Sequence, residues 1–157
     1  RLLQHERSGQ GGLGASGARV AVPRPTPLAD VAKRYRGETD GKIADQAARR
    51  RVLDLAMRQR ALGLTQRRVS EENKSGATMS FATSTFKYIV TNIAQQTADL
   101  RVQFMGTSGL AWEGDAFERP ELDAARGWLG TRAMTIYGGS NEIQLNNIAN
   151  RVLGMPD

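Results

Sequence analysis

Apolar residues recur every three or four positions over long stretches of this chain, which is the spacing of one face of an α-helix. The first stretch predicts a helix over Gly41–Ser70, with a stripe made of Ala48, Val52, Leu55, Leu62 and Val69. The second predicts a helix from about Ser80, stopped at Gly106 and Gly109, with one face made of Phe86, Ile89, Ile93, Thr97, Leu100 and Phe104. Pro120 suits the first turn of a third helix, whose stripe consists of Leu122, Ala125, Leu129, Ala133 and Ile136.

A glycine turn follows the third helix and leads into the last one. Tyr137–Gly139 is predicted to reverse the chain, and Ser140 is a residue type that caps a helix N-terminus. Glu142 would then lie in the first turn, where a negative charge is favourable. The last helix is expected to end near Leu153, because Pro156 prevents much continuation.

The first 40 residues are less regular. Residues 1–8 look like the end of a first helix, and residues 9–27 form a flexible loop rich in glycine and proline. Pro27 can open a short helix over Leu28–Arg36. No stretch shows the alternation of a half-buried strand. We therefore expect an all-α fold: an antiparallel up-and-down four-helix bundle with an additional short C-terminal helix and a long Gly/Pro-rich loop.

Length and composition favour one globular domain over residues 1–157. No run reaches the roughly 18 consecutive apolar residues of a membrane span, and the absence of cysteine removes disulfides and thiolate ligands. We expect a cytoplasmic protein without a metal site, and Arg1 in place of methionine suggests a cut or processed chain. The net charge of +6 raises the alternative of a nucleic-acid module, but the arginines are spread along helices without a recognised motif.

The segment Thr131–Pro156 (TRAMTIYGGSNEIQLNNIANRVLGMP) closely resembles the closing motif of the acyl-CoA dehydrogenase family, flavoenzymes that oxidise acyl-CoA thioesters. The resemblance implies the C-terminal helical-bundle domain of such an enzyme, with the family's N-terminal helical and middle β-domains absent from this chain. It also implies FAD as cofactor, an acyl-CoA substrate and an electron-transfer acceptor. Assembly of the bundles into a dimer or tetramer is a further implication.

The catalytic base is expected from the same resemblance. Many family members carry it as a glutamate directly after the aromatic residue of the closing motif, where this chain has Gly138. Other branches place the base in a Glu-Arg pair on the first helix of the domain, and this chain has Glu6-Arg7. We therefore predict Glu6 as the base, against the alternative that it is an ordinary exposed carboxylate. His5 is given no role by the resemblance.

The resemblance also assigns contacts to the closing turn. Gly138 would offer its backbone N–H to the thioester oxygen, and Tyr137 would lie against the thioester and flavin edge. A core aromatic between helices is an equally open reading of Tyr137, and a tight turn needing positive φ also accounts for Gly138. Ser140 and Glu142 are expected to approach the flavin dinucleotide at a helix N-terminus, which attracts anions.

A second set of contacts is expected after the second long helix. Gln103-Phe104-Met105-Gly106-Thr107-Ser108-Gly109 looks like a family stretch that meets the adenosine-diphosphate part of a flavin held mainly by another subunit. This assigns flavin contact to Gln103, Gly106 and Thr107, with a helix C-cap as the alternative. The family's Arg-x-x-Phe-Gly motif is missing, and either Arg58 or Arg60, in the corresponding helix, could substitute for its arginine. These departures leave open a second function, a non-catalytic assembly domain.

Overall fold

The computed structural model describes residues 25–75 and 82–156, and this part of the chain is mostly helical. Its elements follow in the order α2 (Leu28–Arg36), β1 (Glu38–Thr39), β2 (Lys42–Ile43), α3 (Gln46–Lys74), α4 (Thr83–Met105), the 3-10 helix η2 (Gly106–Leu110), α5 (Arg119–Met134) and α6 (Asn141–Arg151). Within these ranges, no helix combines the length and apolarity that crossing a membrane requires.

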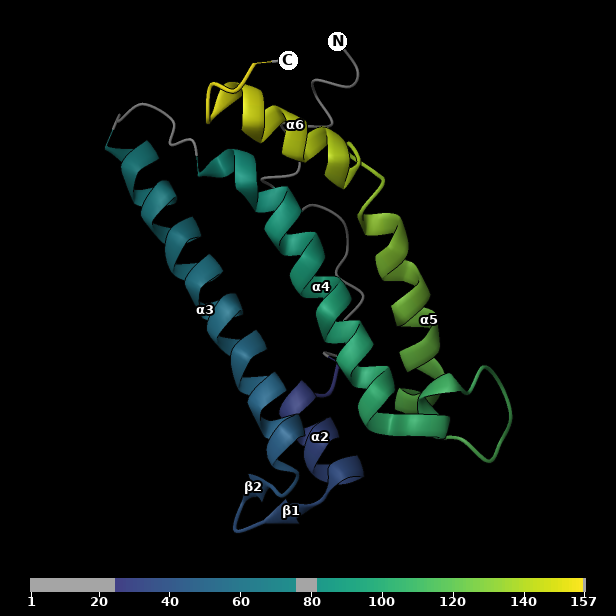
Figure 1. The fold of residues 1–157 in the computed structure, drawn as a ribbon. Helices are drawn as coiled ribbons and strands as arrows, with labels where there is room; N and C mark the ends of the chain where they lie inside the picture. Colours follow the sequence, from purple (N-terminus) through teal and green to yellow (C-terminus); the bar gives the residue numbers. More distant parts are fainter. Residues whose placement is uncertain (1–24, 76–81, 157) are drawn as a thin grey trace.

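Helix α4 lies in the middle of the molecule and packs against every other helix (Figure 1). The helices α3, α4 and α5 run alternately up and down, and α6 crosses the end where α4 begins and α5 ends. This arrangement agrees with an antiparallel helical fold. The predicted first helix and most of the predicted loop, residues 1–24, lie outside the described residues, so the four-helix bundle stays a prediction.

Helix starts follow local capping chemistry. Asp45 caps α3, since its carboxylate accepts a hydrogen bond from the Ala48 N–H at 3.0 Å. Helix α5 begins with a capping box, in which the Glu121 carboxylate accepts from the Glu118 N–H at 2.8 Å. Pro120 stands in its first turn, as predicted. Leu28–Arg36 is a helix with the predicted bounds.

The long helix predicted from Gly41 begins later, at Gln46, and continues to Lys74. Residues before it form a small antiparallel hairpin in which Glu38 pairs with Ile43 and Thr39 with Lys42. The turn residues Asp40 and Gly41 have φ values of 51° and 73°, the conformation that a two-residue hairpin turn needs. The prediction of no strand was therefore wrong at this one short place, although the fold remains a helical one.

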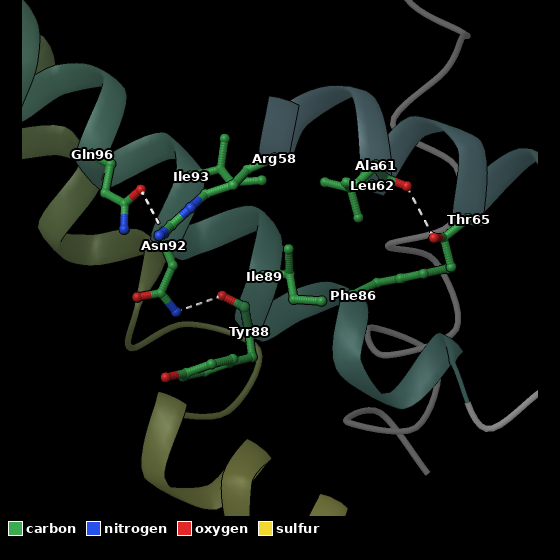
Figure 2. Close-up of a pocket in the computed structure, with 10 residues that line it drawn as sticks. All are labelled: Arg58, Ala61, Leu62, Thr65, Phe86, Tyr88, Ile89, Asn92, Ile93 and Gln96. Atoms are coloured by element: carbon green, nitrogen blue, oxygen red, sulfur yellow. Dashed lines mark hydrogen bonds between the residues drawn. The ribbon is translucent and has the colours of Figure 1, made fainter. Parts of the chain in front are cut away.

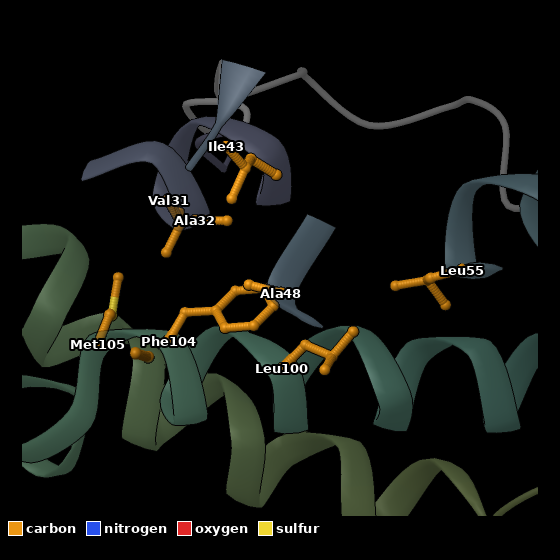
Figure 3. Packing of buried hydrophobic residues seen from close by; sticks show 9 residues of the cluster. Val31, Ala32, Ile43, Ala48, Leu55, Leu100, Phe104 and Met105 are labelled. Atoms are coloured by element: carbon orange, nitrogen blue, oxygen red, sulfur yellow. The ribbon is translucent and has the colours of Figure 1, made fainter. Parts of the chain in front are cut away.

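The hydrophobic core lies between α2, β2, α3, α4 and the start of α5 (Figure 3). Its buried members are Val31, Ala32, Ile43, Ala48, Leu55, Leu100, Phe104, Met105 and Ala124. The stripes predicted on the first two long helices contribute Ala48, Leu55, Leu100 and Phe104 to it. The core therefore fixes the end of α4 from which η2 leaves.

The stripe predicted on the third helix was wrong over its second half, while Leu122 and Ala125 are half-buried. Leu129 is 50% exposed and Ile136 70% exposed, while the buried residues of α5 are Glu121 and Ala124. The helix is rotated so that Trp128 and Arg132 can donate hydrogen bonds to α4. Polar contacts with α4 thus decide which side of α5 faces inward.

A hydrogen bond from the Tyr35 hydroxyl to the Glu121 carboxylate, 2.7 Å long, joins α2 to α5. Burial raises the pKa of Tyr35 to about 12, and the bond to Glu121 adds to this. The same bond, together with the Glu118 N–H, holds the pKa of Glu121 below its ordinary value. The native state therefore binds the Glu121 proton less readily than the unfolded chain does.

We predict that this carboxylate makes the protein sensitive to acid. Its contribution is present above the ordinary carboxylate pKa and is lost as the pH falls through the depressed pKa of Glu121. Chemical unfolding at pH 7 and at pH 3 should show a smaller loss of stability in Glu121→Gln than in the unmodified protein. Asp123→Asn, on the exposed side of the same helix, serves as control. Equal losses in Glu121→Gln and the unmodified protein would contradict the assignment.

Candidate functional site

The turn between α5 and α6, Tyr137–Ser140, is called the glycine corner below. Gly138 and Gly139 have φ values of 68° and 99°, a backbone region that side-chain-bearing residues rarely adopt. The Gln144 side chain donates to the Gly138 carbonyl oxygen at 3.1 Å, and a Cβ atom on Gly139 would lie 2.8 Å from the Gln144 Nε2 atom. Both glycines are therefore required by the conformation of the corner.

Ser140 caps α6, as predicted. Its hydroxyl accepts from the Ile143 N–H at 3.4 Å, and its backbone is extended, as at other helix N-caps. The Glu142 carboxylate accepts hydrogen bonds from the Ser140 side chain and from the Glu142 backbone N–H. These bonds hold the pKa of Glu142 below its ordinary value. The first turn of α6 thus stabilises negative charge.

Tyr137 is 50% exposed in this chain. Its backbone N–H donates to the Ala133 carbonyl oxygen at 3.1 Å, which continues the turn of α5 into the corner. The reading of Tyr137 as a core aromatic between helices does not hold within the described residues. Its ring lies at the surface, next to the two glycines.

The second predicted set lies at the other end of α4. Gly106 ends α4 with a φ of 62°, so the predicted helix C-cap is confirmed, and the exposed Thr107 lies within η2. Gly109 is buried, and a Cβ there would come within 2.7 Å of the Val102 carbonyl oxygen. Asn141, next to the glycine corner, contacts Thr91 of α4, and the 15 residues from Thr91 to Gly106 span about 22 Å of helix. One copy of the chain therefore does not bring the two sets together.

Two arginines meet at Gln103, the first residue of this second set. Arg36, at the end of α2, donates to the Gln103 backbone carbonyl oxygen. Arg51, on α3, donates to the Gln103 side-chain oxygen at 2.6 Å and lies over the Phe104 ring. We call Arg36, Arg51 and Gln103 the arginine cluster.

Sequence reasoning missed both arginines, because they come from two different helices and share no motif spacing with Gln103. The arginines it considered lie elsewhere. Arg58 donates to the Gln96 side chain at 3.3 Å in a groove between α3 and α4 (Figure 2). Arg60 is exposed. A signal that could have found Arg36 is its place in the last turn of the predicted short helix, next to a glycine.

The groove in Figure 2 is lined by apolar and polar side chains of α3 and α4 in equal number, with Tyr88 and Asn92 among the polar ones. Apart from Arg58, its lining includes none of the residues that the sequence suggests for a site. It is therefore separate from the glycine corner and from the arginine cluster.

Glu6 and His5 lie outside the described residues, so the predicted base has no position here. Over residues 25–75 and 82–156, no three His, Cys, Asp or Glu side chains gather as metal ligands would. The candidate site consists of the glycine corner, with Tyr137, Gly138, Ser140 and Glu142, and of the distant set around the arginine cluster.

A family model described as acyl-CoA dehydrogenase, C-terminal domain, matches residues 1–153. The acyl-CoA dehydrogenase IpdE1 of Mycobacterium tuberculosis is 30% identical over 146 residues, which are 92% of this chain and 35% of that protein. IpdE1 of Mycolicibacterium smegmatis is 41% identical over 70 residues, or 45% of this chain and 17% of that protein. The chain thus matches about a third or less of the length of these curated relatives. Because the family model matches nearly all of it, the chain belongs to the acyl-CoA dehydrogenase family and corresponds to the C-terminal domain.

Proposed function

We propose that residues 1–157 form the C-terminal helical-bundle domain of an FAD-dependent enzyme that removes hydrogen from the α and β carbons of an acyl-CoA thioester. The observation that carries the proposal is the glycine corner. It combines a surface aromatic ring, two glycines with positive φ and a capped helix N-terminus within four residues. The matching family model supports the reaction class.

In this proposal the chain performs the proton-transfer half of the reaction. Glu6 takes the α-proton as general base, and the Gly138 N–H donates to the thioester oxygen. That hydrogen bond acidifies the α-carbon, because negative charge develops on the oxygen as the proton leaves. Tyr137 covers the thioester from the side. FAD, when bound, would supply the redox chemistry, which is the acceptance of a hydride from the β-carbon.

The residues present suit an anionic dinucleotide. The N-terminus of α6 offers backbone N–H groups beside Ser140, and such helix ends attract phosphate. At the other end of α4, the arginine cluster presents two guanidinium groups next to the turn at Gly106. Arginine binds phosphate through two parallel hydrogen bonds, so Arg36 and Arg51 are our candidates for the role of the missing family arginine. Gln103, Gly106 and Thr107 would contact the same dinucleotide.

The separation of the two sets supports contact with two flavins. The glycine corner and the arginine cluster lie at opposite ends of α4, so the second set would meet a flavin held by another subunit. We therefore propose a homodimer or homotetramer in which residues 1–8 complete the four-helix bundle. An electron-transfer acceptor and a cytoplasmic location belong to the same proposal.

Removing the Arg51 guanidinium should lower the affinity of the protein for FAD. We expect Arg51→Ala to lose FAD at least tenfold more readily than the unmodified full-length protein, a loss that fits one charge-assisted hydrogen bond. The measurement is the flavin content after gel filtration at increasing salt. Arg50→Ala, a neighbouring exposed arginine, is the matched control. Equal flavin retention in the two variants would rule out a contact through Arg51.

The proposed function is tested by the absorption spectrum of the purified full-length protein. We expect the yellow colour of oxidised flavin and its loss when a CoA thioester is added without oxygen. A panel of straight, branched and ring-bearing acyl groups then defines the substrate. Flavin that no thioester bleaches would favour the second candidate, a non-catalytic assembly domain, which the missing arginine motif supports.

A further inference from the structure

Four polar residues of α4 lie at intervals of four, on the side that faces α5 and α6. They are Lys87, Thr91, Gln95 and Asp99, and we call them the polar row. Residues four apart lie one above the other on a helix. Each of the four interacts with a residue of α5 or α6, at or near the glycine corner.

Asp99 makes the strongest contacts of the row. Its Oδ1 atom accepts hydrogen bonds from the Trp128 indole N–H and from the Arg132 guanidinium, each 2.5 Å long. The guanidinium carbon lies 4.4 Å from the centre of the Trp128 ring, so the two donors also stack on each other. One carboxylate thus holds the last two turns of α5.

Gln95 and Thr91, in the middle of the polar row, contact residues before and after the glycine corner. The Gln95 amide donates to the Thr131 backbone carbonyl oxygen at 3.4 Å, on the α5 side. The Thr91 hydroxyl lies 3.2 Å from the Asn141 side-chain oxygen, on the first residue of α6. Thr91 is 3% exposed, so this contact is inside the protein.

Lys87 is the N-terminal residue of the polar row. Its ammonium nitrogen is buried and has no hydrogen-bond partner among the described residues. The Glu142 carboxylate interacts with it electrostatically. The row therefore brings a positive charge to the first turn of α6.

Backbone hydrogen bonds connect the last turn of α5 to the glycine corner. Arg132 and Ala133 are consecutive, and the Ala133 carbonyl oxygen accepts the N–H groups of Ile136 and Tyr137 at 3.0 and 3.1 Å. The Asn141 N–H donates to the Thr135 carbonyl oxygen at 3.1 Å across the turn. A change in the angle of the last turn of α5 must therefore move Tyr137 and Gly138.

We propose that the polar row of α4 positions the glycine corner, with Asp99 as its main positioning residue. The catalytic part of this inference rests on the proposed function, since the Gly138 N–H must point at the thioester oxygen as charge develops there. The row itself touches no reacting atom. It acts through Trp128, Arg132 and Asn141.

The test compares Asp99→Asn with Asp123→Asn in the full-length protein. Asp123 is an exposed aspartate on α5 that pairs with Arg119, so its replacement removes the same charge outside the row. Amide hydrogen exchange reports the corner without requiring catalysis. In Asp99→Asn we expect the amides of Tyr137 and Asn141 to exchange about tenfold faster, a change that fits the loss of a charged hydrogen bond, with α3 amides unchanged.

The rate of flavin reduction tests whether the position of the glycine corner affects the reaction. We expect Asp99→Asn to slow flavin reduction by acyl-CoA about tenfold while the acyl-CoA dissociation constant changes less than twofold. Thr91→Val, which removes the hydroxyl that lies against Asn141, is a second variant and should speed exchange at Asn141. This variant keeps the test valid if Asp99→Asn folds poorly.

Unchanged corner exchange in both variants would overturn the proposal, as would faster exchange spread over the whole chain. Faster corner exchange with an unchanged reduction rate would overturn the link to catalysis. If the unmodified protein reduces no flavin, the proposed function fails, and the exchange measurement still decides whether the row positions the corner.

Discussion

Replacing Glu6 with glutamine is expected to slow flavin reduction by acyl-CoA about 10²- to 10⁴-fold, the range of a lost general base. Glutamine keeps the size and polarity of the side chain but cannot take a proton at neutral pH. Substrate binding should change little, because the proton moves only in the transition state. Anaerobic stopped-flow absorbance of the full-length protein measures the reduction rate directly.

The control for this experiment is Glu113→Gln, which removes an exposed carboxylate from the loop before α5. Its reduction rate should equal that of the unmodified protein. A Glu6→Gln protein that reduces its flavin at the unmodified rate would remove Glu6 from the mechanism. The base would then have to come from another part of the molecule, since Gly138 stands where many relatives carry theirs.

The second large effect is on stability. Phe104→Ala should lower the free energy of unfolding by about 3–5 kcal/mol, the usual cost of replacing a buried phenylalanine by alanine. Phe104 is 3% exposed and belongs to the core between α2, α3 and α4. Its loss would leave a cavity beneath the arginine cluster. Chemical unfolding followed by circular dichroism gives the difference.

Leu53→Ala on α3 is the matched control for Phe104→Ala, because Leu53 is 56% exposed. Its expected effect is below about 0.5 kcal/mol, as for most surface substitutions. An equal loss in the two variants would mean that the outer side of α3 is covered by another part of the protein or by a second subunit.

Hydrophobic spacing predicted the two long helices α3 and α4, although α3 begins at Gln46 and not at Gly41. It placed Leu55, Leu100 and Phe104 on inward faces, where the structure also has them. The reason is that burial of one apolar stripe dominates the packing of α3 and α4. Proline and serine signals likewise located the starts of α5 and α6.

Predictions from the spacing of apolar residues were wrong where polar contacts or backbone conformation determine the local structure. On α5, Trp128 and Arg132 turn inward to reach Asp99, which leaves Leu129 exposed. In the hairpin, the pair Asp40-Gly41 forms the turn, at the place where apolar spacing predicts a helix from Gly41. Both errors come from weighing apolar residues alone.

The candidate site was only partly predictable. The glycine corner is continuous in sequence, so its turn and cap could be predicted from Gly138, Gly139 and Ser140. The arginine cluster combines residues 36, 51 and 103, which come together only through tertiary packing. The polar row has a regular spacing of four, but nothing in the sequence says which helix it faces.

The most direct test of the account is an experimental structure of the full-length protein with FAD and a bound CoA thioester. We predict the Gly138 nitrogen at about 2.7–3.1 Å from the thioester oxygen, with the Glu6 carboxylate within reach of the α-carbon. A thioester bound away from the glycine corner, or Glu6 on the far side of the bundle, would contradict it.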